Sequence, residues 1–167
     1  LSFHGAIVGF VIGGLLFARK HNLSWFQVMD SIALAGTQGL FFGRLGNFIN
    51  GELYGRMTDS WVGIIFPQGG PYPRHPSQLY EAVAEGIILS LLLWMIKSRT
   101  KIYGIISAFF MIGYGSFRFI VEFFREPDAQ LGFIVGSISM GQILCFIMIL
   151  IGIILLKIAN KKKLFIS

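Results

Sequence analysis

The charged residues with the most specific spacing lie in the segment GYGSFRFIVEFFREPD, at positions 113–128. If this segment is helical, Arg118, Glu122 and Arg125 share one face, because they are separated by four and then three positions. Phenylalanine and aliphatic residues cover the other faces, so the charged face must point into a helix bundle or a wet cavity. Two guanidinium groups suit the binding of phosphate or carboxylate. The alternative is a structural ion pair of Glu122 with one arginine, which leaves the second arginine to be neutralised by another carboxylate or a ligand phosphate.

A second motif, GRLGNFINGELYG, occupies positions 43–55 and combines glycines with Arg44, Asn47, Asn50 and Glu52. We expect it to end a membrane span and open a loop, since non-helical backbone at membrane depth is tolerated where it lines a cavity. The glycines, among them Gly55, permit close backbone approach and positive φ. The alternative is a glycine-rich turn with Arg44 reaching to the lipid headgroups.

A third motif, RHPSQLYEAVAE at positions 74–85, is typical of a helix start. Proline suits the first turn, and we expect Ser77 to help satisfy free backbone amides. A capped helix entry at the membrane interface explains Ser77 and Gln78. The two acidic residues of the motif, Glu81 and Glu85, are four positions apart and share one face of the expected helix. Two further side chains remain candidates for lining a site, namely His75 and Tyr80.

His4 stands in SFHGAIVG near the start of the sequence. A lone histidine at an interface is usually a hydrogen-bonded anchor. It is also a candidate general base, because imidazole accepts a proton near neutral pH.

These residues are carried by an unusually apolar chain of 167 residues, of which 54% are hydrophobic and 13% are charged. Soluble domains carry about 25% charged residues, so the composition excludes disorder, a coiled-coil rod and most soluble enzymes. It predicts an all-α, polytopic membrane protein. The net charge of +6 is better matched to anionic lipid headgroups than to nucleic acid. The single cysteine, Cys145, excludes an internal disulfide and is expected to serve packing.

Five stretches are predicted to cross the bilayer as helices, because about 20 apolar residues suffice. They are 1–18, 25–43, 79–96, 102–124 and 129–156. With five spans every lysine falls on one side, which the positive-inside rule makes cytoplasmic. The sequence would then begin outside and end in the cytoplasm, with the three motifs toward the outer face. It starts without an initiator methionine or a signal-peptide pattern, so we expect it to be a fragment of a longer polypeptide.

The chain resembles the prolipoprotein diacylglyceryl transferase family of bacterial membrane enzymes. The matching segments follow the family order and cover most of the chain: FHGAIVG, GRLGNFINGELYG, RHPSQLYE, GYGSFRFIVEFFREPD and SMGQIL. The resemblance implies a seven-span fold in the bacterial inner membrane, of which this chain holds the last five spans and lacks a tyrosine important in the family. We expect one integral membrane domain, 1–167, with an extracytoplasmic arm at 53–73. Ala6 departs from the glycine usual in the family.

The resemblance also implies a reaction, in which the diacylglyceryl group of phosphatidylglycerol moves to the lipobox cysteine of a preprolipoprotein. Arg44 and Arg118 match the two critical arginines of the family and would clamp the phosphate, with His4 as the candidate base. Other residues would bind or orient substrate: Asn47, Asn50, Glu52, Gly55, His75, Tyr80, Glu122 and Arg125. The implied partners are phosphatidylglycerol, the preprolipoprotein signal peptide and membrane lipids, without nucleic acid.

No metal and no cofactor is expected, because the scheme requires neither and ligand-spaced clusters are missing from the sequence. An arginine-lined anion channel or transporter is the alternative function. A channel needs polar groups along its whole length, whereas the cytoplasmic halves of the expected spans are almost purely apolar. A purely structural membrane scaffold is a second alternative, and it leaves the charged row at 118–125 without a purpose.

Overall fold

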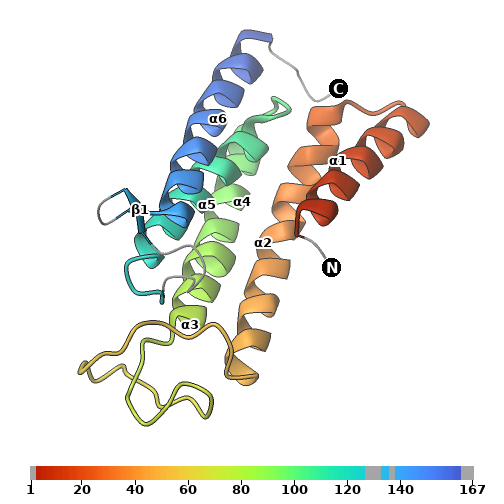
Figure 1. Ribbon diagram of the computed structural model, residues 1–167. Helices are drawn as coiled ribbons and strands as arrows, with labels where there is room; N and C mark the ends of the chain where they lie inside the picture. The colour runs from red at the N-terminus through yellow and green to blue at the C-terminus, as the bar shows by residue number, and fades with distance from the viewer. Residues whose placement is uncertain (1–2, 127–132, 136–137, 163–167) are drawn as a thin grey trace.

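The computed structural model describes residues 3–126, 133–135 and 138–162, with the backbone alone at 3–8, 133–135, 138–139 and 162. These residues form a bundle of helices (Figure 1). The expected helical class is confirmed, with one small addition. Strands β1 (Phe133–Val135) and β2 (Ile138–Ser139) pair antiparallel before the last helix.

Two helices open the fold and three further helical segments follow a long loop. The first are α1 (Phe3–Lys20) and α2 (Trp25–Ile49). One continuous helix then combines α3 (Ser77–Glu81), a π-helical stretch η1 (Ala82–Ile88) and α4 (Leu89–Arg99). It is followed by α5 (Ile105–Val121) and α6 (Met140–Lys162).

Three expected boundaries are wrong. Helix α2 continues to Ile49 instead of ending at position 43, because the cost of a glycine, about 1 kcal/mol, is too small to stop a packed helix. Helix α5 ends at Val121, so Arg125 lies beyond it and not on its face. The last helix begins at Met140, and the described part of the preceding apolar run is the β1–β2 pair. Short apolar runs do not distinguish helix from strand by periodicity.

Helices α5 and α6 make the most extensive contact, while α2 packs against α3, η1, α4 and α5. The buried core between α2, α4 and α5 contains Ala33, Leu89, Leu93 and Ile106. Close approach of η1 to α2 depends on Gly86, where an added Cβ would lie 2.6 Å from the Cβ of Phe41. This contact holds the two helices together near the end where the sequence motifs lie.

Asp30 links α2 to the start of α5. Its carboxylate accepts hydrogen bonds from the Gly104 amide at 2.7 Å, the Ser107 amide at 2.8 Å and the Ser107 hydroxyl at 2.6 Å. The first amides of a helix have no partner within the helix, so this buried acid satisfies two of them and complements the helix dipole. The ionisable residue in the second expected span therefore has a structural role.

Two helices among the described residues are long and apolar enough to cross a membrane, Ser77–Arg99 and Met140–Lys161, and Ile105–Val121 is a shorter apolar helix. Large apolar side chains are exposed on the first two, including Leu91 at 61%, Leu144 at 56% and Phe146 at 59%. Such surfaces are typical of contact with lipid.

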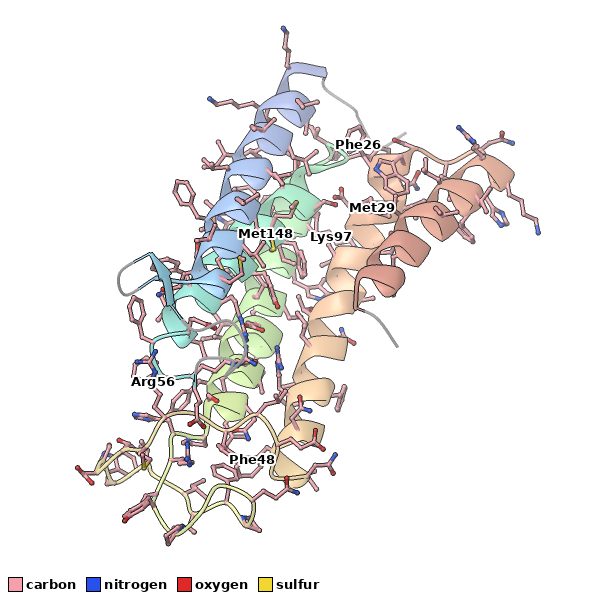
Figure 2. All side chains as sticks on the ribbon, viewed as in Figure 1. Phe26, Met29, Phe48, Arg56, Lys97 and Met148 are labelled. Atoms are coloured by element: carbon pink, nitrogen blue, oxygen red, sulfur yellow. The ribbon has the colours of Figure 1, made fainter. Side chains whose placement is uncertain are left out.

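The segment between α2 and α3 is an irregular loop at one end of the bundle (Figure 1). Arg74 holds it together through hydrogen bonds to the carbonyl oxygens of Gly69 and Gly55 and an ion pair with Glu126 at 2.6 Å. Figure 2 places Phe48 at the same end of α2, where its ring meets that of Phe66 in the loop. The loop is therefore packed against the end of the bundle that carries the motifs.

Candidate active site

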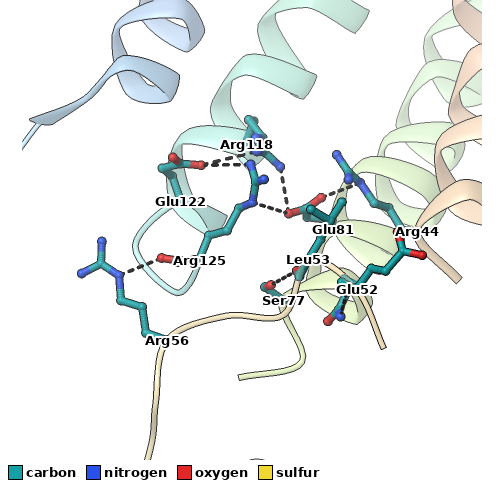
Figure 3. A network of polar contacts seen from close by, with 10 residues as sticks. Arg44, Glu52, Leu53, Arg56, Ser77, Glu81, Arg118, Glu122 and Arg125 are labelled. Carbon is teal, nitrogen blue, oxygen red and sulfur yellow. Dashed lines mark hydrogen bonds and ion pairs between the residues drawn. The ribbon is translucent and has the colours of Figure 1, made fainter. Parts of the chain in front are cut away.

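The candidate site is organised around the carboxylate of Glu81, whose side chain is 2% exposed. Arg44 Nε lies 2.5 Å from Oε2 of Glu81, and Arg118 Nη1 lies 2.8 Å from Oε1 (Figure 3). Arg125 Nε lies 3.9 Å from Oε1. Opposite charges at the two shorter distances attract each other strongly where the dielectric is low. We call the group of Arg44, Glu81, Arg118, Glu122 and Arg125 the arginine cluster.

The cluster joins three parts of the chain that are distant in sequence. Arg44 comes from α2, Glu81 ends α3, and Arg118 stands in the last turn of α5. The helical continuation of α2 through 43–49 is what carries Arg44 to this position, contrary to the expected loop. Because Gly86 brings η1 against α2, the side chain of Arg44 can reach Glu81 across the helix contact.

Glu122 holds the two arginines that flank it in sequence. Its Oε2 lies 3.5 Å from Arg118 Nη2 and 3.9 Å from Arg125 Nη1. The expected grouping of Arg118, Glu122 and Arg125 is thus confirmed in space, although not as one helical row. Glu122 terminates α5, and the chain turns before Arg125 pairs with Gly55. The second arginine is neutralised by another carboxylate, which is Glu81.

Gly55 lies in a tight position between two neighbouring segments. Its amide donates to the carbonyl oxygen of His75 at 2.8 Å, and the next amide, of Arg56, donates to Phe124 at 3.0 Å. A Cβ at Gly55 would overlap the carbonyl oxygen of Phe124 and lie 2.9 Å from the Cβ of His75. The Arg56 side chain adds a hydrogen bond to the carbonyl oxygen of Arg125 at 2.7 Å (Figure 3). Gly55 therefore positions the backbone of Arg125 and does not itself offer a side chain.

His75 and Tyr80 contact each other next to this segment. Nδ1 of His75 and the Tyr80 hydroxyl are 3.1 Å apart, and both rings pack edge to face on Phe124. These two expected site residues are therefore brought together against Phe124, which directly precedes Arg125 in the chain.

Asn47, Asn50 and Glu52 lie at the loop end of α2. Backbone bonds fix this region, since the amide of Asn50 donates to Gly46 and that of Glu52 donates to Asn47. Within the described part of the chain their side chains make no hydrogen bond and no ion pair. Their proposed role in orienting a substrate stays a prediction.

Three buried polar residues of the site were not among the expected site residues. Glu81 is 1% exposed, while Ser77 and Gln78 are 0% and 1% exposed. Ser77 does not cap its helix, because Pro76 precedes it and its hydroxyl donates to the carbonyl oxygen of Leu53. Gln78 donates to the carbonyl oxygen of Glu52. The available signal was the carboxylate of Glu81 inside an apolar stretch, which marks a functional site by default.

His4 belongs to α1, but its side chain lies outside the part of the chain that the structure describes. The same holds for positions 127 and 128 at the end of the third sequence segment.

Comparison with known proteins identifies the family. The model of the family "Prolipoprotein diacylglyceryl transferase" matches residues 1–158. A relative from Geobacter sulfurreducens is 51% identical over 163 residues, covering 98% of this chain and 63% of its own length. One from Nitratidesulfovibrio vulgaris is 50% identical, covering 97% and 62%. One from Chlorobaculum tepidum is 52% identical over 154 residues, covering 92% and 53%.

These three relatives are named phosphatidylglycerol–prolipoprotein diacylglyceryl transferase. The chain spans about three fifths of the length of the first two. The match nevertheless extends over nearly all of its own residues, including every residue of the arginine cluster. The chain belongs to the prolipoprotein diacylglyceryl transferase family.

Proposed function

We propose that the protein containing this chain transfers the diacylglyceryl group of phosphatidylglycerol to the lipobox cysteine of a preprolipoprotein. A thioether forms between the cysteine sulfur and the glyceryl carbon, the carbon–oxygen bond to phosphate breaks, and glycerol phosphate leaves. The observation that carries the proposal is the convergence of Arg44 and Arg118 on the anionic oxygens of Glu81, from separate helices, at 2.5 and 2.8 Å.

The arginines supply fixed positive charge where the leaving group becomes more negative. A phosphodiester becomes a phosphomonoester during the reaction, so preorganised cations in a water-poor site stabilise the transition state more than the ground state. Arg44 approaches Glu81 through Nε. Its two terminal nitrogens make no hydrogen bond within the described residues, which leaves donors for a phosphate oxygen.

The other residues have supporting roles in this scheme. Glu81 and Glu122 hold the guanidinium groups in place, and Arg125 adds positive charge at the edge of the cluster. His4 is the proposed base that takes the thiol proton, since the thiolate is the reactive nucleophile. Asn47, Asn50 and Glu52 are proposed to orient the lipid headgroup, with His75 and Tyr80 beside it.

The proposed setting is the bacterial inner membrane. Five helices of one membrane domain, 1–167, would cross the bilayer, with the cluster toward the outer face and the carboxyl terminus in the cytoplasm. The placement of lysines in the sequence supports this orientation. The loop at 53–73 would then form an arm outside the membrane, at the end of the bundle that carries the cluster. Neither the relatives nor the described contacts support an arginine-lined anion channel.

The test uses the complete polypeptide encoded by the gene, purified and supplied with phosphatidylglycerol and a lipobox peptide. Peptide mass and released glycerol phosphate report turnover. Arg44→Ala and Arg118→Ala are each expected to lower kcat by about 100-fold or more. Arg118→Lys should restore little, because lysine lacks the planar pair of donors.

Arg99→Lys is the matched control, because Arg99 is exposed in the last turn of α4. It should leave turnover unchanged. Near-normal turnover in the folded Arg44→Ala or Arg118→Ala variant would refute the phosphate clamp, and absence of transfer by the unmodified protein would refute the function.

A further inference from the structure

Glu85 is a buried acid that the proposed reaction does not use. Its side chain is 0% exposed. Neither carboxylate oxygen has a hydrogen-bond partner within the described residues. Buried side-chain polar atoms normally have at least one partner, so each exception requires an explanation. Glu85 lies inside the Ser77–Arg99 helix, which is apolar enough to cross a membrane.

The position of Glu85 couples it to the arginine cluster. It stands in η1, one turn after Glu81, in the π-helical stretch that Gly86 holds against α2. Single-turn π-helical stretches occur frequently at functional sites. The charged and titratable groups that interact with it come from all the packed elements: Glu81 from α3, Arg44 from α2, Tyr114, Arg118 and Glu122 from the α5 region, and Cys145 from α6.

The charges of this region balance in two different ways. The three arginines of the cluster face two carboxylates, Glu81 and Glu122, which leaves one positive charge. An ionised Glu85 neutralises that charge in the empty site. A bound phosphodiester also carries one negative charge, so with Glu85 ionised the occupied site would hold one excess negative charge. Excess charge away from water is unfavourable. A protonated Glu85 removes it.

We propose that Glu85 is ionised when the arginine cluster is empty. It takes up a proton from solvent when the phosphodiester of the lipid binds to the arginines. One proton from solvent joins the carboxylate on binding and returns to solvent when the phosphate leaves. This inference rests on the proposed function, since it takes phosphatidylglycerol as the anion. Glu85 is thus a positioning residue, which acts through the charge of the cluster and does not touch the reacting atoms.

The test measures proton uptake during binding of phosphatidylglycerol to the complete polypeptide in detergent, without peptide, so that no turnover occurs. A phosphodiester does not titrate near neutral pH, so it contributes no proton of its own. Calorimetric titrations in Tris and in HEPES, which differ in ionisation enthalpy, give the number of protons taken up per lipid. The expected number approaches one proton per lipid. The affinity for phosphatidylglycerol should fall by up to about tenfold for each unit by which the pH rises.

Glu85→Gln is expected to bind with the same heat in both buffers and with an affinity independent of pH. Asp59→Asn is the control, because Asp59 is an exposed acid in the loop, and it should take up protons as the unmodified protein does. Undiminished uptake by Glu85→Gln would overturn the inference. If phosphatidylglycerol binds to the unmodified protein without proton uptake, the role of Glu85 is refuted and the proposed function stands. If phosphatidylglycerol does not bind at all, both the role of Glu85 and the proposed function are refuted.

A second measurement covers the case in which Glu85→Gln does not fold. The infrared difference spectrum of the unmodified protein, with and without phosphatidylglycerol, should gain the carbonyl band of a protonated carboxylic acid. Glu85→Asp should shift that band. A spectrum without the band, or a band that stays unchanged in Glu85→Asp, would contradict the proposal.

Discussion

Arg44 Nε lies 2.5 Å from Oε2 of Glu81, although the two residues belong to helices that a long loop separates in the chain. This pair joins the end of α2 to the start of the next helix at the position where the arginines gather. Because Glu81 also pairs with Arg118, removal of this one carboxylate takes away the negative charge that two partly buried guanidinium groups share.

Glu81→Gln is therefore expected to lower the free energy of unfolding by about 3–5 kcal/mol and to reduce transfer activity. Glutamine keeps the size of the side chain but withdraws the negative charge that the arginines share. Thermal or denaturant unfolding in detergent measures the first effect. Glu126→Gln is the control, since Glu126 is 48% exposed beside Arg74 and its pair contributes about 0–1 kcal/mol. Equal losses in both variants would contradict the central role of Glu81.

Gly55→Ala is expected to disturb the backbone at Arg125 and thereby lower activity. The added methyl group overlaps the carbonyl oxygen of Phe124, and a forced fit of this kind costs about 1–3 kcal/mol. Unfolding and turnover measured together check both effects. Gly39→Ala provides the comparison, because nothing lies within 4 Å of its added Cβ. An unaffected Gly55→Ala enzyme would show that the segment can shift freely.

Asp30→Asn is expected to reduce stability without changing kcat. The amide retains one acceptor, so it cannot serve both Gly104 and Ser107 as the carboxylate does. An unsatisfied buried donor costs about 1–3 kcal/mol. The measurement pairs an unfolding curve with the transfer assay at a temperature where the variant stays folded. A variant that loses turnover while remaining fully folded would give Asp30 a role beyond joining α2 to α5.

His4→Gln tests the proposed base. Turnover should fall near neutral pH and recover in part at high pH, because a cysteine thiol with a pKa of about 8.5 then ionises without help. Initial rates over a range of pH check this, with the unmodified protein measured alongside. His21→Gln is the control, since His21 is exposed in the turn after α1. A loss of equal size at every pH would contradict the base role.

The membrane class and the helical fold could be predicted from local sequence. Long apolar stretches predict membrane-spanning helices, and arginines beside such stretches make anion binding a prediction. The grouping of Arg118 with Glu122 and Arg125 also followed from spacing, because Arg118 and Glu122 are one helical turn apart and the chain turns directly after α5. The end of α2 did not follow, since packing against η1 and α5 outweighs the low helix propensity of Gly43 and Gly46.

The sequence alone determined which residues are available for chemistry: arginines without lysines near the motifs, acids inside an apolar helix, and a composition that requires lipid. Only the tertiary structure decided that Glu81 is the shared partner of Arg44 and Arg118, and that Glu85 is enclosed beside them. The reason is that helix packing brings together side chains from distant parts of the chain, and no local spacing encodes which of two acids on one helix face meets them.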